Sequence, residues 1–297
     1  MMRLTLLIVL GFLWSARLAA IKAASLSGIP LHVTISVAVL GIALAFTMVS
    51  LARRSWPPLD RSALIFYLLS GIFGFILPFV IENVVGPRLP VFLFVVIIST
   101  MPVLTILLAS VLGVERPERK QVIAVALGFL TAILIAVDAR GAGQNINVDL
   151  IWIMIGFSVP VVYAANTIFI ASRWPQSPDA VHVANAQAVI VGLSALVVGT
   201  VTGGISEWTT AARNTPAILA IISCEALALL VYLKLARDHG ASYVAQANYI
   251  SMLFAAALGF VLFGENLSWL SIVAAMLLIL ALRIGRRSVS PEKSDTN

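Results

Sequence analysis

The stretch TPAILAIISCEALALLVYLKL, residues 215–235, sets the class of this protein. It has the length and apolar character of a helix that crosses a lipid bilayer, which takes about 20 mostly apolar residues. Glu225 lies near its middle. A charged side chain at that depth costs about 2.5–3.5 kcal/mol on insertion scales. We therefore expect Glu225 to have a partner inside the protein, a function in the membrane, or both.

The composition of the whole chain extends this interpretation. The 297 residues are 61% hydrophobic and 11% charged, whereas ordinary soluble domains carry about 25% charged residues. We therefore predict an all-α integral membrane protein. The formal net charge of +6 lies in short loops, where basic residues set membrane orientation, so we expect no nucleic-acid partner. The single cysteine, Cys224, excludes an intramolecular disulfide.

Ten segments are long and apolar enough to be predicted as transmembrane helices. Charged residues, proline, glycine or Asn/Asp bound each one, and the loops between them are too short to hold a soluble domain. The first segment shares features with a secretory signal peptide, but we expect it to be retained as a span. The predicted spans are 3–22, 31–52, 62–84, 89–113, 119–138, 149–172, 182–202, 215–236, 243–264 and 267–285.

The distribution of Lys and Arg predicts the orientation. With the N-terminus in the cytoplasm, 14 of the 19 basic residues lie on the cytoplasmic side, four lie outside, and Arg17 lies within the membrane. Cytoplasmic loops carry the excess of Lys and Arg in multi-pass proteins. We therefore predict a multi-pass protein of the inner (plasma) membrane with both termini in the cytoplasm.

The two halves of the sequence resemble each other. A shift of 150 residues places Glu115 on Glu265, each at the end of a long apolar run, and a shift of 145 pairs Gly11 with Gly156. Because five spans per half is an odd number, the halves must be inverted in the membrane. We predict two inverted five-helix repeats, residues 1–146 and 147–286, followed by a disordered cytoplasmic tail, 287–297. Secondary transporters have this organisation, with a substrate site near the midplane between the halves.

Three stretches resemble the ten-helix EamA-type exporters of the drug/metabolite transporter superfamily. They are GFLWS (11–15), STMPVLTILLASVLGVE (99–115) and LGFVLFGENLSWLSIVAAMLLIL (258–280). The resemblance covers nearly the whole chain and implies ten helices, cytoplasmic termini and transport of small metabolites or drugs. The chain departs from the family pattern at Met252, which stands where the first copy has Pro102, and at Arg17 in the first helix.

Helix depth brings Arg17 and Glu225 into one candidate site. At 1.5 Å per residue, Glu225 lies roughly 15 Å and Arg17 roughly 8 Å below the outer face. The difference is about one helical turn, within reach of two long side chains. Two interpretations remain open: a polar pocket that presents a carboxylate and a guanidinium to a solute, or a structural ion pair that neutralises itself.

Further polar and aromatic residues lie at helical spacing in the predicted spans. Each amide could instead form an interhelical hydrogen bond, worth about 0.6 kcal/mol, as could Asn185. Together they favour a wet cavity with aromatic walls. The predicted substrate-binding residues are Glu225, Arg17, Trp14, Asn166, Tyr163, Gln187, Gln246, Asn248 and Tyr249.

Other notable positions are assigned structural roles. We expect Glu115 and Glu265 to cap neighbouring helices, and Glu82 and Asp138 to be solvated at the outer interface. Pro78, Pro102 and Pro160 interrupt spans and can act as hinges or kinks. The three histidines fall at membrane edges, so we expect neither a metal site nor a cofactor.

Missing motifs restrict the function. The sequence has no P-loop, HExxH, CxxC or Gly-x-Ser-x-Gly motif, which argues against an enzyme and against direct use of ATP. We predict a secondary transporter that exports a small organic metabolite, such as an amino acid, by alternating access. One alternative is a proton-coupled exporter of cationic drugs or quaternary amines, with Glu225 as cation and proton site. Another is an intramembrane enzyme or a non-transporting receptor. The expected partners are the solute and the lipid bilayer, and a homodimer is left open.

Overall fold

The computed structural model describes residues 2–111, 119–141, 149–175, 178–201, 204–239, 247–265 and 268–284, and these residues form helices and short connections without a strand. Glu115, Gln246 and the tail 287–297 lie outside the described residues. The side chains of Pro102, Asp138 and Tyr249 are likewise not described, although their backbones lie in helices.

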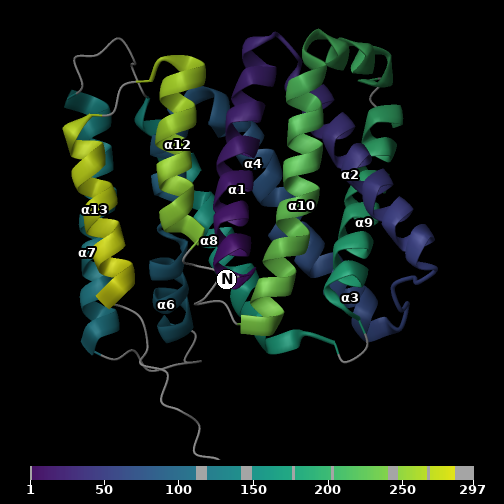
Figure 1. Ribbon diagram of the computed structural model, residues 1–297, viewed down its shortest axis with the longest axis horizontal. Helices are drawn as coiled ribbons and strands as arrows, with labels where there is room; N and C mark the ends of the chain where they lie inside the picture. The colour runs from purple at the N-terminus through teal and green to yellow at the C-terminus, as the bar shows by residue number, and fades with distance from the viewer. Residues whose placement is uncertain are drawn as a thin grey trace, which may run out of the picture.

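The helices run side by side along one direction (Figure 1). Two of the rods are broken into consecutive pieces, and one 3-10 helix lies across an end of the bundle. Their bounds are α1 (Met2–Leu26), α2 (Leu31–Arg53), α3 (Arg61–Gly71) with η1 (Ile72–Ile76), α4 (Leu77–Val85) and η2 (Gly86–Arg88), α5 (Val91–Ile98) with α6 (Met101–Val111), α7 (Arg119–Gly141), α8 (Leu150–Arg173), α9 (Ala180–Val201), η3 (Gly204–Asn214), α10 (Thr215–His239), α12 (Ala247–Phe263) and α13 (Trp269–Ile284).

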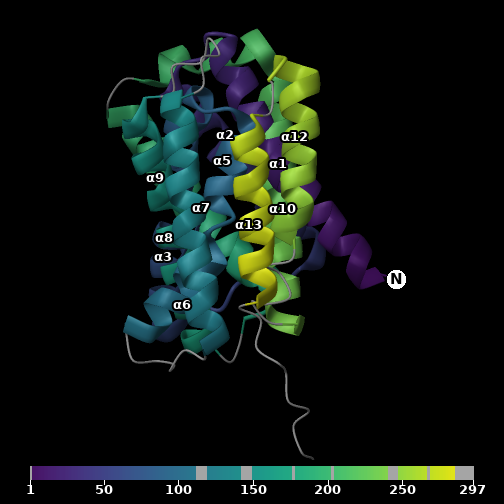
Figure 2. The same cartoon turned by 90° about the vertical axis from the view of Figure 1, so that its left-hand side faces the viewer.

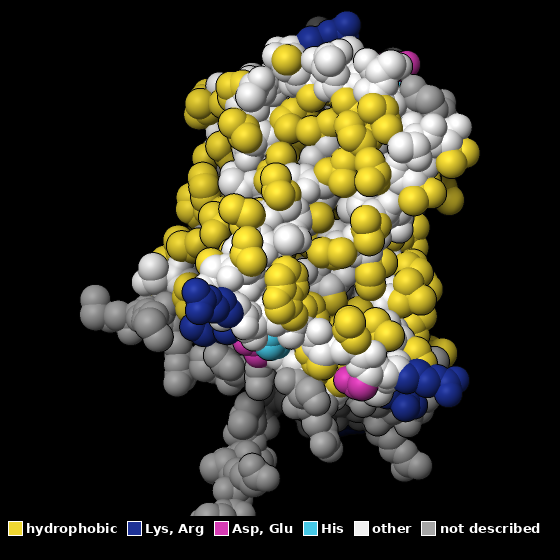
Figure 3. Space-filling model, turned by 90° about the vertical axis from the view of Figure 1, so that its right-hand side faces the viewer, with side chains coloured by type: hydrophobic (Ala, Val, Ile, Leu, Met, Phe, Trp, Pro, Cys, Tyr) yellow, Lys and Arg dark blue, Asp and Glu magenta, His cyan; other side chains and the backbone are white. Residues whose placement is uncertain are grey.

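Seven of the described helical segments are long and apolar enough to cross a membrane, by length and composition. Two shorter apolar helices, Ile250–Phe263 and Trp269–Ala281, accompany them. Large apolar side chains cover the outside of the bundle, and Figure 3 shows them as a belt on one face with charged side chains at its two ends. A lipid environment accounts for this surface, since a soluble monomer rarely exposes large contiguous apolar patches.

Helix α1 lies in the middle of the bundle, where it packs against both α10 and α12. Helices α7 and α13 pair on one side, and α2 pairs with α9 on the other (Figures 1 and 2). The short α5 is buried along Val91–Ile97, as expected of a helix that is apolar on every face. Helix α1 is therefore one of several elements that contact both halves of the chain.

The contact between α1 and α12 depends on Gly11. A Cβ at that position would lie 2.9 Å from the carbonyl oxygen of Ala247 and from the backbone nitrogen of Ser251. The hydroxyl of Ser15 donates to the carbonyl oxygen of Ser251 over 2.7 Å. Small residues permit this close approach of two membrane helices, and a hydroxyl hydrogen bond then joins them.

The broken rods coincide with prolines. Proline removes a backbone donor and clashes with the carbonyl four residues earlier. Before Pro78 the chain adopts the π-helix η1, and α6 begins at Met101 directly before Pro102, after a turn at Ser99–Thr100. By contrast, Pro160 lies inside the continuous helix α8.

Candidate substrate site

Arg17 lies between two carboxylates in the interior of the bundle. Its Nε is 2.8 Å from Oε2 of Glu225 on α10, and its Nη1 forms an ion pair with Oε2 of Glu82 on α4. The side chains of Arg17 and Glu82 are almost fully buried, at 4% and 1% exposed, whereas Glu225 is 13% exposed. We call Arg17, Glu82 and Glu225 the charge triad.

Two aromatic residues complete the surroundings of the charge triad. The hydroxyl of Tyr163 on α8 donates to Oε1 of Glu82 over 3.1 Å. The guanidinium carbon of Arg17 lies 5.9 Å from the centre of the Phe79 ring, within the range of a cation–π contact. Four helices, α1, α4, α8 and α10, therefore contribute to one buried polar site, and two belong to each half of the chain.

The structure corrects the expectation for Glu82. We predicted that it would be solvated at an interface, but Glu82 is fully buried. The helical segment continues beyond the predicted end at residue 84, through η2 to Arg88, so Glu82 lies inside the bundle opposite Arg17. A carboxylate near a predicted helix end is ambiguous in the sequence, because its depth depends on where the helix stops.

Three other predicted site residues are described by contacts of their own. The ring of Trp14 lies beside that of Tyr232, with centroids 6.4 Å apart, between α1 and α10. Asn166 on α8 is buried against the backbone of Gly74, and its Oδ1 has no hydrogen-bond partner among the described residues. Asn248 on α12 is also buried. Among these residues, Asn166 is the one with an unused buried acceptor.

The amides on α9 form interhelical hydrogen bonds. Gln187 Nε2 donates to Ser70 Oγ over 2.7 Å, and Asn185 Nδ2 donates to the carbonyl oxygen of Phe46 over 3.1 Å and to Ser50 Oγ. Gln187 therefore forms the interhelical hydrogen bond that was the alternative to lining a cavity, and it links α3 to α9.

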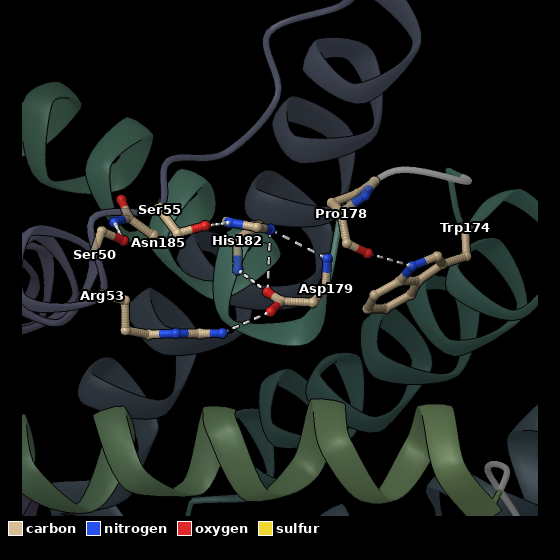
Figure 4. Close-up of polar contacts among 8 residues, drawn as sticks. All are labelled: Ser50, Arg53, Ser55, Trp174, Pro178, Asp179, His182 and Asn185. Carbon is tan, nitrogen blue, oxygen red and sulfur yellow. Dashed lines mark hydrogen bonds and ion pairs between the residues drawn. The ribbon is translucent and has the colours of Figure 1, made fainter.

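A second polar cluster joins α2 to the start of α9 at one end of the bundle, which we call the Arg53 end (Figure 4). Asp179 Oδ2 is 3.1 Å from Arg53 Nη2, and Asp179 Oδ1 accepts the backbone N–H of His182 over 2.8 Å. The hydroxyl of Ser55 is 2.8 Å from His182 Nε2. Burial alone would raise the pKa of Asp179, but the hydrogen bonds from His182 and Arg53 outweigh it and hold that pKa below its usual value.

At the opposite end, which we call the Lys22 end, Glu265 joins the two halves. Its Oε2 accepts the backbone N–H of Val91 at the start of α5 over 2.8 Å, and its Oε1 is 2.5 Å from Lys22 Nζ on α1. A carboxylate at the first turn of a helix offsets the positive end of the helix dipole. Glu265 thus lies where a capping residue acts.

The described residues contain no group of three or more His, Cys, Asp or Glu side chains that could hold a metal ion. In the charge triad, both carboxylates already face Arg17. The site thus combines two carboxylate acceptors with one guanidinium donor, and Glu225 is the most exposed of the three side chains.

Residues 1–137 match the model of the EamA-like transporter family. This N-terminal part of the chain is therefore similar to that family. A solved structure described as "Crystal structure of protein" covers 96% of this chain and 98% of its own, with a TM-score of 0.62 at 15% identity, and so shares the fold. No curated protein matches the sequence.

Proposed function

We propose that this EamA-like protein is a secondary active transporter that exports small organic solutes bearing a positively charged group, by alternating access. In this proposal, ten spans form two inverted five-helix repeats, residues 1–146 and 147–286. The charge triad of Arg17, Glu82 and Glu225 is the substrate site between them. Its position supports this, because the triad takes α1 and α4 from the first repeat and α10 from the second.

The charge balance of the triad is the observation that carries the proposal. Two carboxylates face one guanidinium, so the formal charges leave one negative charge in excess within the bundle. An uncompensated buried charge is strongly destabilising. A bound cation, either the ammonium group of a solute or a proton, would restore the balance. Glu225 is the most exposed of the three side chains and is the group that such a cation can reach.

The same geometry ranks the candidate solutes. The two carboxylates contact Nε and Nη1 of Arg17, so the carboxylate of an amino acid could approach the guanidinium only beside two groups of like charge. An ammonium group meets no such repulsion from the carboxylates. The triad therefore favours cationic solutes, and it accommodates an amino acid chiefly through the ammonium group.

The arrangement of the helices supports the proposed topology. Helix α1 begins and α13 finishes at the same end of the bundle in both ribbon views (Figures 1 and 2). A chain that crosses the membrane an even number of times begins and finishes on the same side. The excess of Lys and Arg in the corresponding loops supports the proposal that this end lies in the cytoplasm and that the protein resides in the plasma (inner) membrane.

Counterflow in proteoliposomes tests the proposal. Vesicles containing the purified protein and loaded with unlabelled amine should accumulate the same labelled amine, and Glu225→Gln should abolish the uptake. The matched control is Glu207→Gln, because Glu207 is 55% exposed in η3 and should transport as the wild type does. Full counterflow by Glu225→Gln, with the same pH dependence, would contradict the assigned site. If neither amines nor amino acids were exchanged, the alternative of an intramembrane enzyme or receptor would be favoured.

A further inference from the structure

The ammonium group of Lys22 lies in a site made of three different acceptors. Nζ is 2.5 Å from Oε1 of Glu265 and 3.2 Å from the carbonyl oxygen of Leu89, and it lies 5.1 Å from the centre of the Phe263 ring. A carboxylate, a carbonyl and an aromatic face are the groups that recognise organic ammonium ions. The Lys22 side chain is 14% exposed and that of Glu265 is 6% exposed, so the contact is largely desolvated.

Groups other than Lys22 hold the Glu265 carboxylate in place. Gly264 has a φ of +64°, and the backbone N–H of Glu265 donates to the carbonyl oxygen of Gly259 over 3.1 Å. A Cβ at position 259 would overlap Oε2 of Glu265, so the glycine leaves the space that the carboxylate occupies. Oε2 also accepts the N–H of Val91. The acceptor is therefore preorganised, whereas Lys22 reaches it on a flexible four-carbon stem.

A pocket of about 470 Å³ adjoins this site at the Lys22 end of the bundle. A lysine side chain that leaves Glu265 can swing into this space, and a small solute can enter through it. The residues that line it include Lys22, Leu26, Arg88, Leu262, Phe263 and Glu265.

We propose that Glu265, the Leu89 carbonyl and the Phe263 ring form a second cation site, which Lys22 occupies in this structure and which takes a small organic ammonium group when Lys22 swings away. This inference rests on the proposed transport of cationic solutes and adds a docking point on their route. It is separate from the charge triad, because Lys22 follows Arg17 by five residues, about 8 Å along α1. The polar partners of Lys22 are Leu89, just before α5, and Glu265, just after α12, rather than residues of α4 and α10.

Lys22 controls access to this second cation site, because it competes with a free cation for the same acceptors. A side chain attached beside its own acceptor acts at an effective concentration in the millimolar range, so a free cation displaces it only with difficulty. Removal of the Lys22 charge should therefore create a measurable binding site for a free ammonium ion. A conformational change that withdraws α1 would do the same during transport.

Binding of tetramethylammonium to the full-length protein in detergent tests this proposal. The measurements use the Glu225→Gln background, so that the charge triad does not contribute to tetramethylammonium binding. The proposed transport function is tested separately, by counterflow. Lys22→Met in this background should bind tetramethylammonium about tenfold or more tightly than the background alone, by calorimetry. Adding Glu265→Gln should abolish the gain. Lys22→Arg, which keeps the charge, should show none, and tert-butanol, an uncharged molecule of similar size, should not bind.

A second measurement uses the wild-type protein, in which folding is not in question. Tetramethylammonium at saturating concentration should raise the rate at which an amine-acetylating reagent modifies Lys22 several-fold, as read by mass spectrometry of its peptide. An unchanged Lys22 rate would overturn the proposal, as would Lys22→Met that folds but binds no more tightly than its background. Loss of amine counterflow in Glu225→Gln together with a positive Lys22→Met result would support both sites independently.

Discussion

Arg17 is the only cation in the charge triad, and its removal should cost more than the removal of either carboxylate. Arg17→Met would leave Glu82 and Glu225 buried together without a compensating cation, and breaking a buried ion pair in this way costs about 3–5 kcal/mol. Glu82→Gln would leave one guanidinium facing one carboxylate, so its loss should be smaller. Unfolding of the purified variants in detergent measures both.

Arg213→Met is a suitable control for that comparison, because Arg213 is exposed and donates to the carbonyl oxygen of Gly28 at the surface. It should unfold close to the wild type. If Arg17→Met were as stable as Arg213→Met, the carboxylates would not depend on Arg17 for their charge compensation.

Asp179 at the Arg53 end makes a pH-dependent contribution to stability. Its pKa is lowered in the folded protein, so the folded state binds this proton less tightly than the unfolded state does. The stabilisation is therefore present above the ordinary pKa of Asp and is lost as the pH falls through the lowered value. Asp179→Asn keeps a capping oxygen and removes the charge, so it should cost about 0.3–1 kcal/mol near neutral pH, the contribution of a charge at a helix terminus.

The measurement is the difference in unfolding free energy between wild type and Asp179→Asn from neutral to acidic pH. This difference should shrink on acidification. A difference that stays constant would show that the negative charge of Asp179 contributes nothing to stability.

The π-helix η1 decides which face of its rod meets Arg17. A π turn accommodates one extra residue, which rotates everything that follows by about 100°. Glu82 and Phe79 lie after η1 and face Arg17, whereas Ser70 lies before it and bonds to Gln187 on α9. One rod thus presents polar groups to two different neighbours, and Pro78 explains why the irregular turn lies there.

The packing of α1 predicts different outcomes for two glycines that the internal repeat aligned. Gly11→Ala would drive a methyl group into the backbone of α12, whereas a Cβ at Gly156 would meet side chains at an ordinary 3.6 Å. Overpacking of this kind costs about 1–3 kcal/mol. Gly11→Ala should therefore lower the melting temperature in detergent clearly, and Gly156→Ala should change it little. Equal effects would mean that the contact between α1 and α12 relaxes freely.

For the whole molecule, the orientation in the membrane is the property to measure. In a Cys224→Ala background, Leu59→Cys introduces a thiol in the loop at the Arg53 end, and Thr209→Cys introduces one in η3 at the Lys22 end. Both positions are exposed. A membrane-impermeant maleimide should label Thr209→Cys in intact cells and Leu59→Cys only after the membrane is opened. The reverse pattern would invert the proposed topology.

The positions of the helices follow closely from the sequence. Apart from η3, which lies in a predicted loop, and the break at Ser99–Thr100 in the predicted span 89–113, the described helices begin and end within a few residues of the predicted spans. Long apolar runs bounded by charged and turn residues leave few alternatives in a bilayer. The pairing of Arg17 with Glu225 was also predictable, since opposite charges at similar depth in a membrane usually form an ion pair.

Only the tertiary structure added Glu82 to the pair of Arg17 and Glu225. The formal charge of the site is therefore −1 rather than zero. The sequence did not contain this information in readable form, because burial of Glu82 depends on the continuation of the rod to Arg88 and on the turn at η1. The Lys22–Glu265 contact was hidden for a related reason: it joins residues 243 positions apart, and apolar periodicity does not specify which helices become neighbours. Apolar length and charge bias therefore determine where this chain enters and leaves the membrane, while the packing of one helix against another decides which charges meet.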